Sequence, residues 1–165
     1  MTGLLGSAVG ASFNRSATYD LLLLAHVLAA LVGLGATAAS GVAAWRVRGP
    51  GSPPPAAARY FRPGPDVAGR TLYLVPVLGV VLVALSHGTW SFSDTWVEAG
   101  AALWAAAVGA GEAVLWPAEA ALTRLVAEPA APGTDRRSPA LRVALASAAV
   151  IVLVVTAAVL MVGKP

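Results

Sequence analysis

The sequence predicts an all-α polytopic membrane protein, an antiparallel four-helix transmembrane bundle, and three observations support this fold class. First, 58% of the 165 residues are hydrophobic, and the mean hydropathy is +0.75. Second, charged residues make up 12% of the chain, about half the share usual in soluble domains. Third, four apolar stretches are long enough to cross a bilayer, at residues 20–45, 71–88, 95–125 and 141–162. We therefore expect one membrane domain over residues 1–165, with long loops at 46–70 and 126–140.

The first predicted span follows a short N-terminal tail, opens near Tyr19 and Asp20, and closes near Trp45. Helical periodicity divides it into two faces. The face that holds His26 is otherwise small or weakly polar, with Ala29, Ala30, Gly33, Thr37, Ser40 and Gly41. The opposite face carries Leu24, Leu28, Leu31 and Leu34. Because small residues let helices approach closely, we expect the first face to meet other helices and the leucines to meet lipid.

Proline, glycine and hydroxyl residues mark the rest of the chain. Residues 46–69 are predicted to be a solvated connector with an extended polyproline segment at Pro53–Pro55. His87 lies at the far end of the second span, before an aromatic turn that includes Trp90. Thr95 and Glu98 have the spacing of a capping box at the start of the third span, and Pro117 is predicted to bend that span. The fourth span has two interior hydroxyls, Ser147 and Thr156.

The distribution of basic residues predicts the orientation. Two basic residues, Arg15 and Lys164, fall on the side of the termini. Nine arginines fall on the side of the two long loops, namely Arg46, Arg48, Arg59, Arg62, Arg70, Arg124, Arg136, Arg137 and Arg142. By the positive-inside rule, the loops are expected to be cytoplasmic and both termini extracytoplasmic.

The two histidines are expected in the outer leaflet at different depths, His26 within the first span and His87 at the end of the second. Either imidazole has a structural interpretation. His26 can form a hydrogen bond with a neighbouring helix, and His87 can lie at the interface with water. The functional alternative is an axial ligand to haem or another metal.

Three carboxyls, Glu98, Glu112 and Glu119, share one side of the third span, within about 60° at 100° per residue. Glu98 is explained by the helix cap, and Glu119 by its proximity to Arg124 and the interface. Glu112 lies inside the apolar region, so we expect a protonated carboxyl that donates to one of three hydroxyls at similar depth, those of Thr37, Ser40 and Ser147. This hydrogen bond would serve packing, proton handling or ligand binding.

Several function classes find no support. The basic residues form no patch interleaved with aromatics, so nucleic acid is not an expected partner. The chain has no cysteine, which excludes disulfides, iron–sulfur clusters and c-type haem attachment. No soluble-enzyme motif is present.

The histidine in LLLLAHVLAALVGLG, the four spans, the short tryptophan-containing turn and the end MVGKP together resemble a family of small bacterial integral membrane proteins of unknown function. They are also distantly similar to CopD-like copper-resistance proteins and HemJ-type protoporphyrinogen oxidases. The match covers His26, Lys164-Pro165 and the overall topology. This resemblance implies the bacterial inner membrane and a b-type haem.

Two functions follow as hypotheses. The first is a non-enzymatic transport, binding or accessory component in the lipid bilayer, as a homo-oligomer or part of a membrane complex, in which Glu112 and the small face of the first span line a path or an interface. The alternative is a haem b protein with redox or porphyrin-related activity and His26 as ligand. A purely structural role for the polar residues remains a third interpretation.

Overall fold

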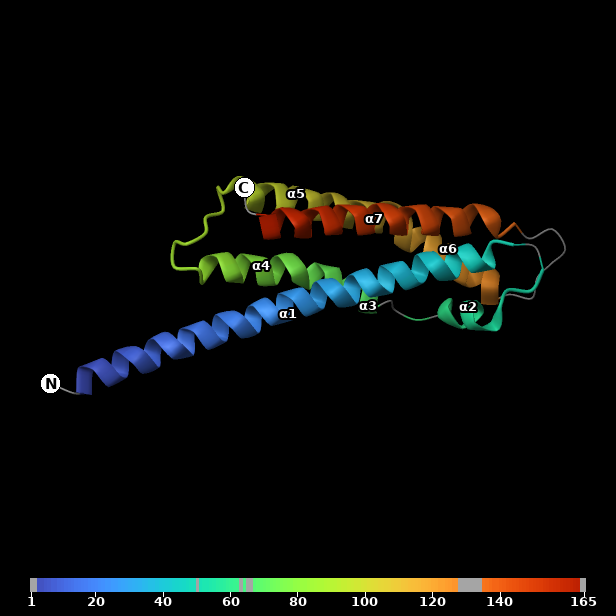
Figure 1. Cartoon of the computed structure of the whole chain (residues 1–165). Coiled ribbons are helices and arrows are strands. Elements are labelled where there is room, and N and C mark those ends of the chain that lie inside the picture. The colour runs from blue at the N-terminus through green and yellow to red at the C-terminus, as the bar shows by residue number, and fades with distance from the viewer. Residues whose placement is uncertain (1–2, 50, 63, 65–66, 128–134, 164–165) are drawn as a thin grey trace.

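The fold is all-helical, and four long apolar helices pack together as the sequence predicts (Figure 1). This computed structural model describes residues 3–49, 51–62, 64, 67–127 and 135–163, with side chains from residue 17 onward. Four segments are long and apolar enough to cross a membrane: Ala17–Val47, Val67–Ala84, Thr95–Ala127 and Arg137–Gly163. The end Lys164-Pro165, which contributes to the family resemblance, lies outside the described residues.

The first span lies within α1 (Gly3–Val47), which is longer than expected. The prediction that the helix opens at Tyr19 is wrong, because α1 begins at Gly3. The sequence explains the extension, since no proline interrupts residues 3–47. Figure 1 shows the N-terminal part of α1 extending past the other helices.

The second span is built from three consecutive helical segments, α3 (Val67–Arg70), the 3₁₀ turn η1 (Thr71–Tyr73) and α4 (Leu74–Ala84). The tight turn η1 comes just before Pro76, where the helix lacks a backbone donor. His87 lies beyond α4 in the aromatic turn and has a positive φ of 52°, and Gly88 follows with a φ of 83°. The ring of Trp90 in this turn makes an edge-to-face contact with Trp96, just after the turn, with the ring centres 5.3 Å apart.

The third span consists of α5 (Thr95–Ala110), the π-helical segment η2 (Gly111–Leu115) and α6 (Trp116–Ala127). The predicted capping box is wrong, because Asp94 is the N-cap and no side-chain cap bond forms there. Pro117 lacks the N–H that an α-helix needs at that position, and the wider turn of η2 directly before it accommodates the loss. The predicted irregularity at Pro117 therefore takes the form of a π-bulge.

The fourth span is α7 (Arg137–Gly163), which packs against α1 on one side and α5 on the other. The second span packs mainly against α1. Figure 1 shows the start of α1 and the end of α7 on the side of the α4–α5 turn. The end of α1, the end of α6 and the start of α7 lie on the other side, which we call the arginine-rich end. The largest fully buried apolar side chains are Leu122, Val47, Val143 and Val150, and the core includes Phe61 of the first long loop.

The first long loop is more ordered than a solvated connector. Pro54 has extended dihedral angles (φ −55°, ψ 134°), as the polyproline prediction expects, but Pro55 begins the short helix α2 (Pro55–Tyr60). Proline suits the first position of a helix because its missing N–H has no partner there in any case. The hydroxyl of Tyr60 donates to the backbone carbonyl of Ala36 on α1 at 3.1 Å, and the buried Arg136 donates to the carbonyl of Gly51. The loop therefore packs onto the bundle.

The small face of α1 meets other helices, which confirms its predicted role. A Cβ at Gly33 would lie 2.6 Å from Leu72 Cγ, and one at Gly41 would lie 2.9 Å from Ser147 Cβ. On the opposite face, Leu24, Leu28 and Leu31 are exposed, as expected for lipid contact, whereas Leu34 is partly buried against the core.

Candidate functional site

The strongest candidate site lies around η2, where two intramembrane carboxyls form hydrogen bonds with hydroxyls of other helices. The side chain of Glu112 in η2 accepts a hydrogen bond from the hydroxyl of Tyr73 in η1. Seven residues later, Glu119 in α6 accepts one from the hydroxyl of Ser40 in α1. π-bulges often occur at functional positions in helices.

The expected partners of Glu112 were wrong. Ser40 pairs with Glu119, Thr37 donates to the carbonyl of Gly33 in its own helix at 2.8 Å, and Ser147 Oγ has no hydrogen-bond partner. The reason is geometric, because Glu112 lies on the exposed side of the third span while these three hydroxyls are buried. Glu119 also differs from the expectation. Its side chain was expected at the membrane interface near Arg124, but its carboxyl contacts Ser40 of α1.

A signal for the Ser40–Glu119 pair was present in the sequence. Ser40 lies seven residues before the end of α1, and Glu119 lies eight residues before the end of α6, so both are at one depth from the arginine-rich end. The Tyr73–Glu112 pair gave no such signal. Tyr73 lies three residues after Arg70, whereas Glu112 lies twelve residues before Arg124, so their distances from the arginines do not match.

Aromatic and cation–π contacts lie beside the Tyr73–Glu112 pair. The ring of Trp116 lies 5.7 Å from that of Tyr73, and the guanidinium of Arg70 lies 5.8 Å from the centre of the Trp116 ring. The indole nitrogen of Trp104 in α5 donates to the carbonyl of Leu72 at 3.0 Å and ties η1 to the third span. The second and third spans are thus linked at η1 by polar and aromatic contacts.

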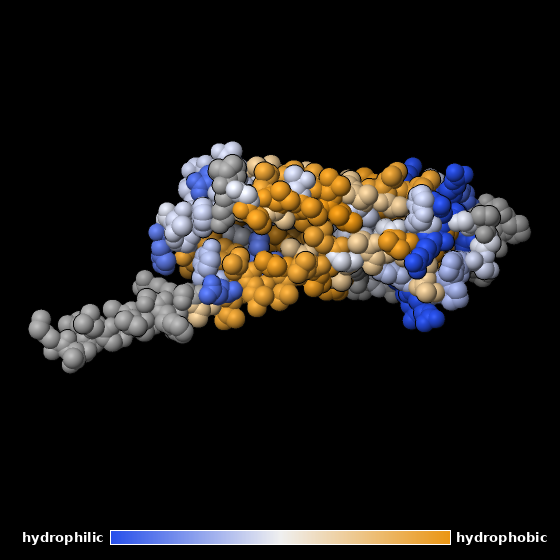
Figure 2. Space-filling view, viewed as in Figure 1, coloured by the Kyte–Doolittle hydropathy of each residue, from blue (hydrophilic) through white to orange (hydrophobic). Residues whose placement is uncertain are grey.

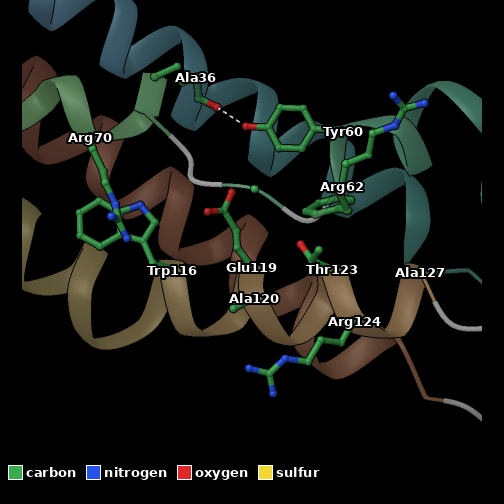
Figure 3. Close-up of a pocket in the computed structure, with 13 residues that line it drawn as sticks. Ala36, Tyr60, Arg62, Arg70, Trp116, Glu119, Ala120, Thr123, Arg124 and Ala127 are labelled. Atoms are coloured by element: carbon green, nitrogen blue, oxygen red, sulfur yellow. Dashed lines mark hydrogen bonds between the residues drawn. The ribbon is translucent and has the colours of Figure 1, made fainter.

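A groove of about 920 Å³ opens beside Glu119 at the arginine-rich end. We call it the arginine-lined groove, since Arg62, Arg70 and Arg124 all contribute to its lining. Tyr60 and Trp116 supply aromatic walls. Figure 3 shows Glu119 pointing from α6 into the space beneath Tyr60, with Arg70 over Trp116 and the guanidinium groups of Arg62 and Arg124 turned away from Glu119.

The two histidines occupy different environments. The imidazole of His26 lies against α4, where it interacts with the backbone of Val75, and a Cβ at Gly79 would be 3.4 Å from its Cε1. Its Nδ1 atom is buried and has no hydrogen-bond partner. His87 is exposed in the turn beyond the end of α4, eight residues after Gly79. The structure therefore does not bring the two imidazoles together on one level.

The remaining candidate residues lie apart from the groove. Glu98 is exposed in the first turn of α5, about 21 Å along the helix from Glu112. Thr37 is buried and satisfied by its own helix. Within the described parts of the chain, no cluster of three or more acidic or histidine side chains is suitable for a metal ion.

The helices and their apolar surfaces define a multi-pass integral membrane protein with a four-helix bundle (Figure 2). Residues 20–165 match the family described as "Predicted integral membrane protein (DUF2269)", and the chain belongs to that family. No curated protein and no solved structure matches the chain.

Proposed function

We propose that this protein is a non-enzymatic binding component of the membrane, and that the arginine-lined groove takes an amphiphile with an anionic head group. The observation that carries the proposal is the combination, in one groove of about 920 Å³, of three arginines with two aromatic walls at an end of the spans. Guanidinium groups bind phosphate and carboxylate through paired hydrogen bonds. Basic pockets at this depth suit lipid head groups.

The position of the groove supports a ligand that is part apolar and part charged. Its lining includes the small side chains of Ala36, Ala68 and Ala120 as well as the arginines. An acyl chain would lie along the apolar part while the head group pairs with Arg70. The hydrogen bond from Ser40 holds the Glu119 carboxyl against α1 at the wall of the groove.

The test is lipid binding by the detergent-purified chain, measured by native mass spectrometry with phosphatidylglycerol and phosphatidylcholine. Arg70→Ala is expected to weaken phosphatidylglycerol binding by about ten- to hundredfold, since a hydrogen bond to a charged group contributes about 1.5–3 kcal/mol. Arg142→Ala is the matched control, because Arg142 is exposed at the same end but is not part of the groove. Equal binding by wild type and Arg70→Ala would refute the proposal.

The second candidate function is the haem b protein that the resemblance to CopD-like and HemJ-type proteins implies. One observation favours it, the buried Nδ1 of His26 without a partner. The fit is poor, however. The ring packs directly on α4 at Gly79, which leaves no room for a porphyrin on that side, and His87 is exposed elsewhere. Protein purified from haem-replete cells should then be colourless, and a Soret band lost in His26→Ala would favour haem instead.

We also propose that the arginine-rich end faces the cytoplasm of a bacterial inner membrane, with both termini outside. The support is the bias of nine arginines toward the two long loops. A periplasm-active phosphatase fused after Gly163 should be active, and the same enzyme inserted between Pro53 and Pro54 should be inactive. The reverse pattern would overturn this orientation and place the groove in the outer leaflet.

A further inference from the structure

The exposed surface of α5 differs from those of α1, α4 and α7. Large aliphatic side chains are exposed on α1, α4 and α7, among them Leu28, Val80 and Val152. On α5, which the structure describes in full, no large hydrophobic side chain is exposed. Its exposed apolar residues are Ala101, Ala102, Ala105, Ala106 and Gly109. Bulky aliphatics suit lipid contact, whereas small residues suit contact with another helix.

The same surface carries a carboxyl inside the membrane. Glu112 continues the side of α5 that holds Ala105 and Gly109, and it is exposed. It lies near the middle of the 33-residue span Thr95–Ala127. Its carboxyl accepts a hydrogen bond from Tyr73, and the residue remains exposed beside that contact. Facing hydrocarbon, such a group would be costly.

We propose that a second copy of this chain covers this surface and forms a two-fold dimer through Ala105, Gly109 and Glu112. A protonated carboxyl is both donor and acceptor, so two copies of Glu112 related by a two-fold axis can satisfy each other. A different partner would have to supply a matching polar group at the same depth, whereas a second copy supplies it by symmetry. The small residues permit the close approach that this contact needs. The dimer is independent of the ligand in the groove.

The chain has no cysteine, so single cysteines can map the interface directly. Gly109→Cys and Ala105→Cys, in native membranes with a mild oxidant, should form disulfide-linked dimers of twice the monomer mass. Ala148→Cys is the matched control, an exposed small residue on the α7 surface that should stay monomeric. Dimers at Ala148 as abundant as at Gly109, or no dimer at either α5 position, would overturn the proposal.

A second set of variants tests the role of the carboxyl. In the Gly109→Cys background, Glu112→Ala should reduce cross-linking by roughly three- to tenfold. This is the change in affinity expected from the loss of one interhelical hydrogen bond in a membrane. Glu112→Gln should retain most of it, because an amide also donates and accepts. Unchanged cross-linking in Glu112→Ala would remove the carboxyl from the interface. A cross-linked band whose mass is not a multiple of the monomer would replace the second copy with another protein.

Discussion

Helices α1 and α5 both carry a surface of alanine and glycine, but only the surface on α1 is packed against other helices of the chain. On α1, Gly33 and Gly41 are in close contact with Leu72 and Ser147 of the same chain. On α5, a Cβ at Gly109 would meet no atom within 4 Å. The same sequence pattern therefore serves contacts within the chain in one helix and is left uncovered in the other. A face of small residues therefore indicates contact with another helix, but it does not identify the chain to which that helix belongs.

The largest expected effect comes from filling the covered surface. Gly33→Leu should lower the thermal unfolding temperature in detergent strongly, because even its Cβ would lie 2.6 Å from Leu72 Cγ. Overpacking of this type typically destabilises by about 1–3 kcal/mol or more. The control is Gly35→Leu on the same helix, where a Cβ meets nothing within 4 Å. Equal unfolding temperatures for the two variants would mean that the α1–η1 contact does not hold the bundle together.

Gly109→Leu is the equivalent substitution on the exposed surface of α5. The monomer should keep the unfolding temperature of the wild type, since the added side chain has open space around it. The dimer should be lost, because a leucine blocks the close approach of two α5 helices. Light scattering of the detergent-solubilised protein separates the two effects. A less stable monomer would show that this surface is already covered within the chain.

The same contrast separates the features that the sequence predicts from those that it does not. Helical period and hydropathy were enough for the four spans, because they depend on local composition. The lipid-facing position of Leu28 and the packing of Gly33 followed from the same period. Pairs such as Tyr73 with Glu112 depend on where two helices cross, and on the π-bulge that re-aims the second of them, which no local pattern records.

The next largest effect is expected at Glu119, the carboxyl that is hydrogen-bonded between helices of the bundle. Glu119→Ala leaves the hydroxyl of Ser40, which is 1% exposed, without its acceptor. An unsatisfied buried hydroxyl typically costs about 1–3 kcal/mol, so the unfolding temperature should fall by several degrees. Glu119→Gln should restore most of the loss, because the amide oxygen still accepts. If both variants unfold like the wild type, the Ser40–Glu119 bond contributes nothing to stability.

The smallest expected effect falls on Ser147, the other hydroxyl on the covered side. Ser147 is 1% exposed, and its Oγ has no hydrogen-bond partner although it faces Gly41. Since the buried hydroxyl has no bond to lose, Ser147→Ala should leave stability unchanged or raise it by up to about 1 kcal/mol. Ser40→Ala, which deletes a donor to Glu119, should be the more harmful of the two. If Ser147→Ala lowered the unfolding temperature more than Ser40→Ala, the stabilising polar contact on this face of α1 would be made by Ser147 and not by Ser40.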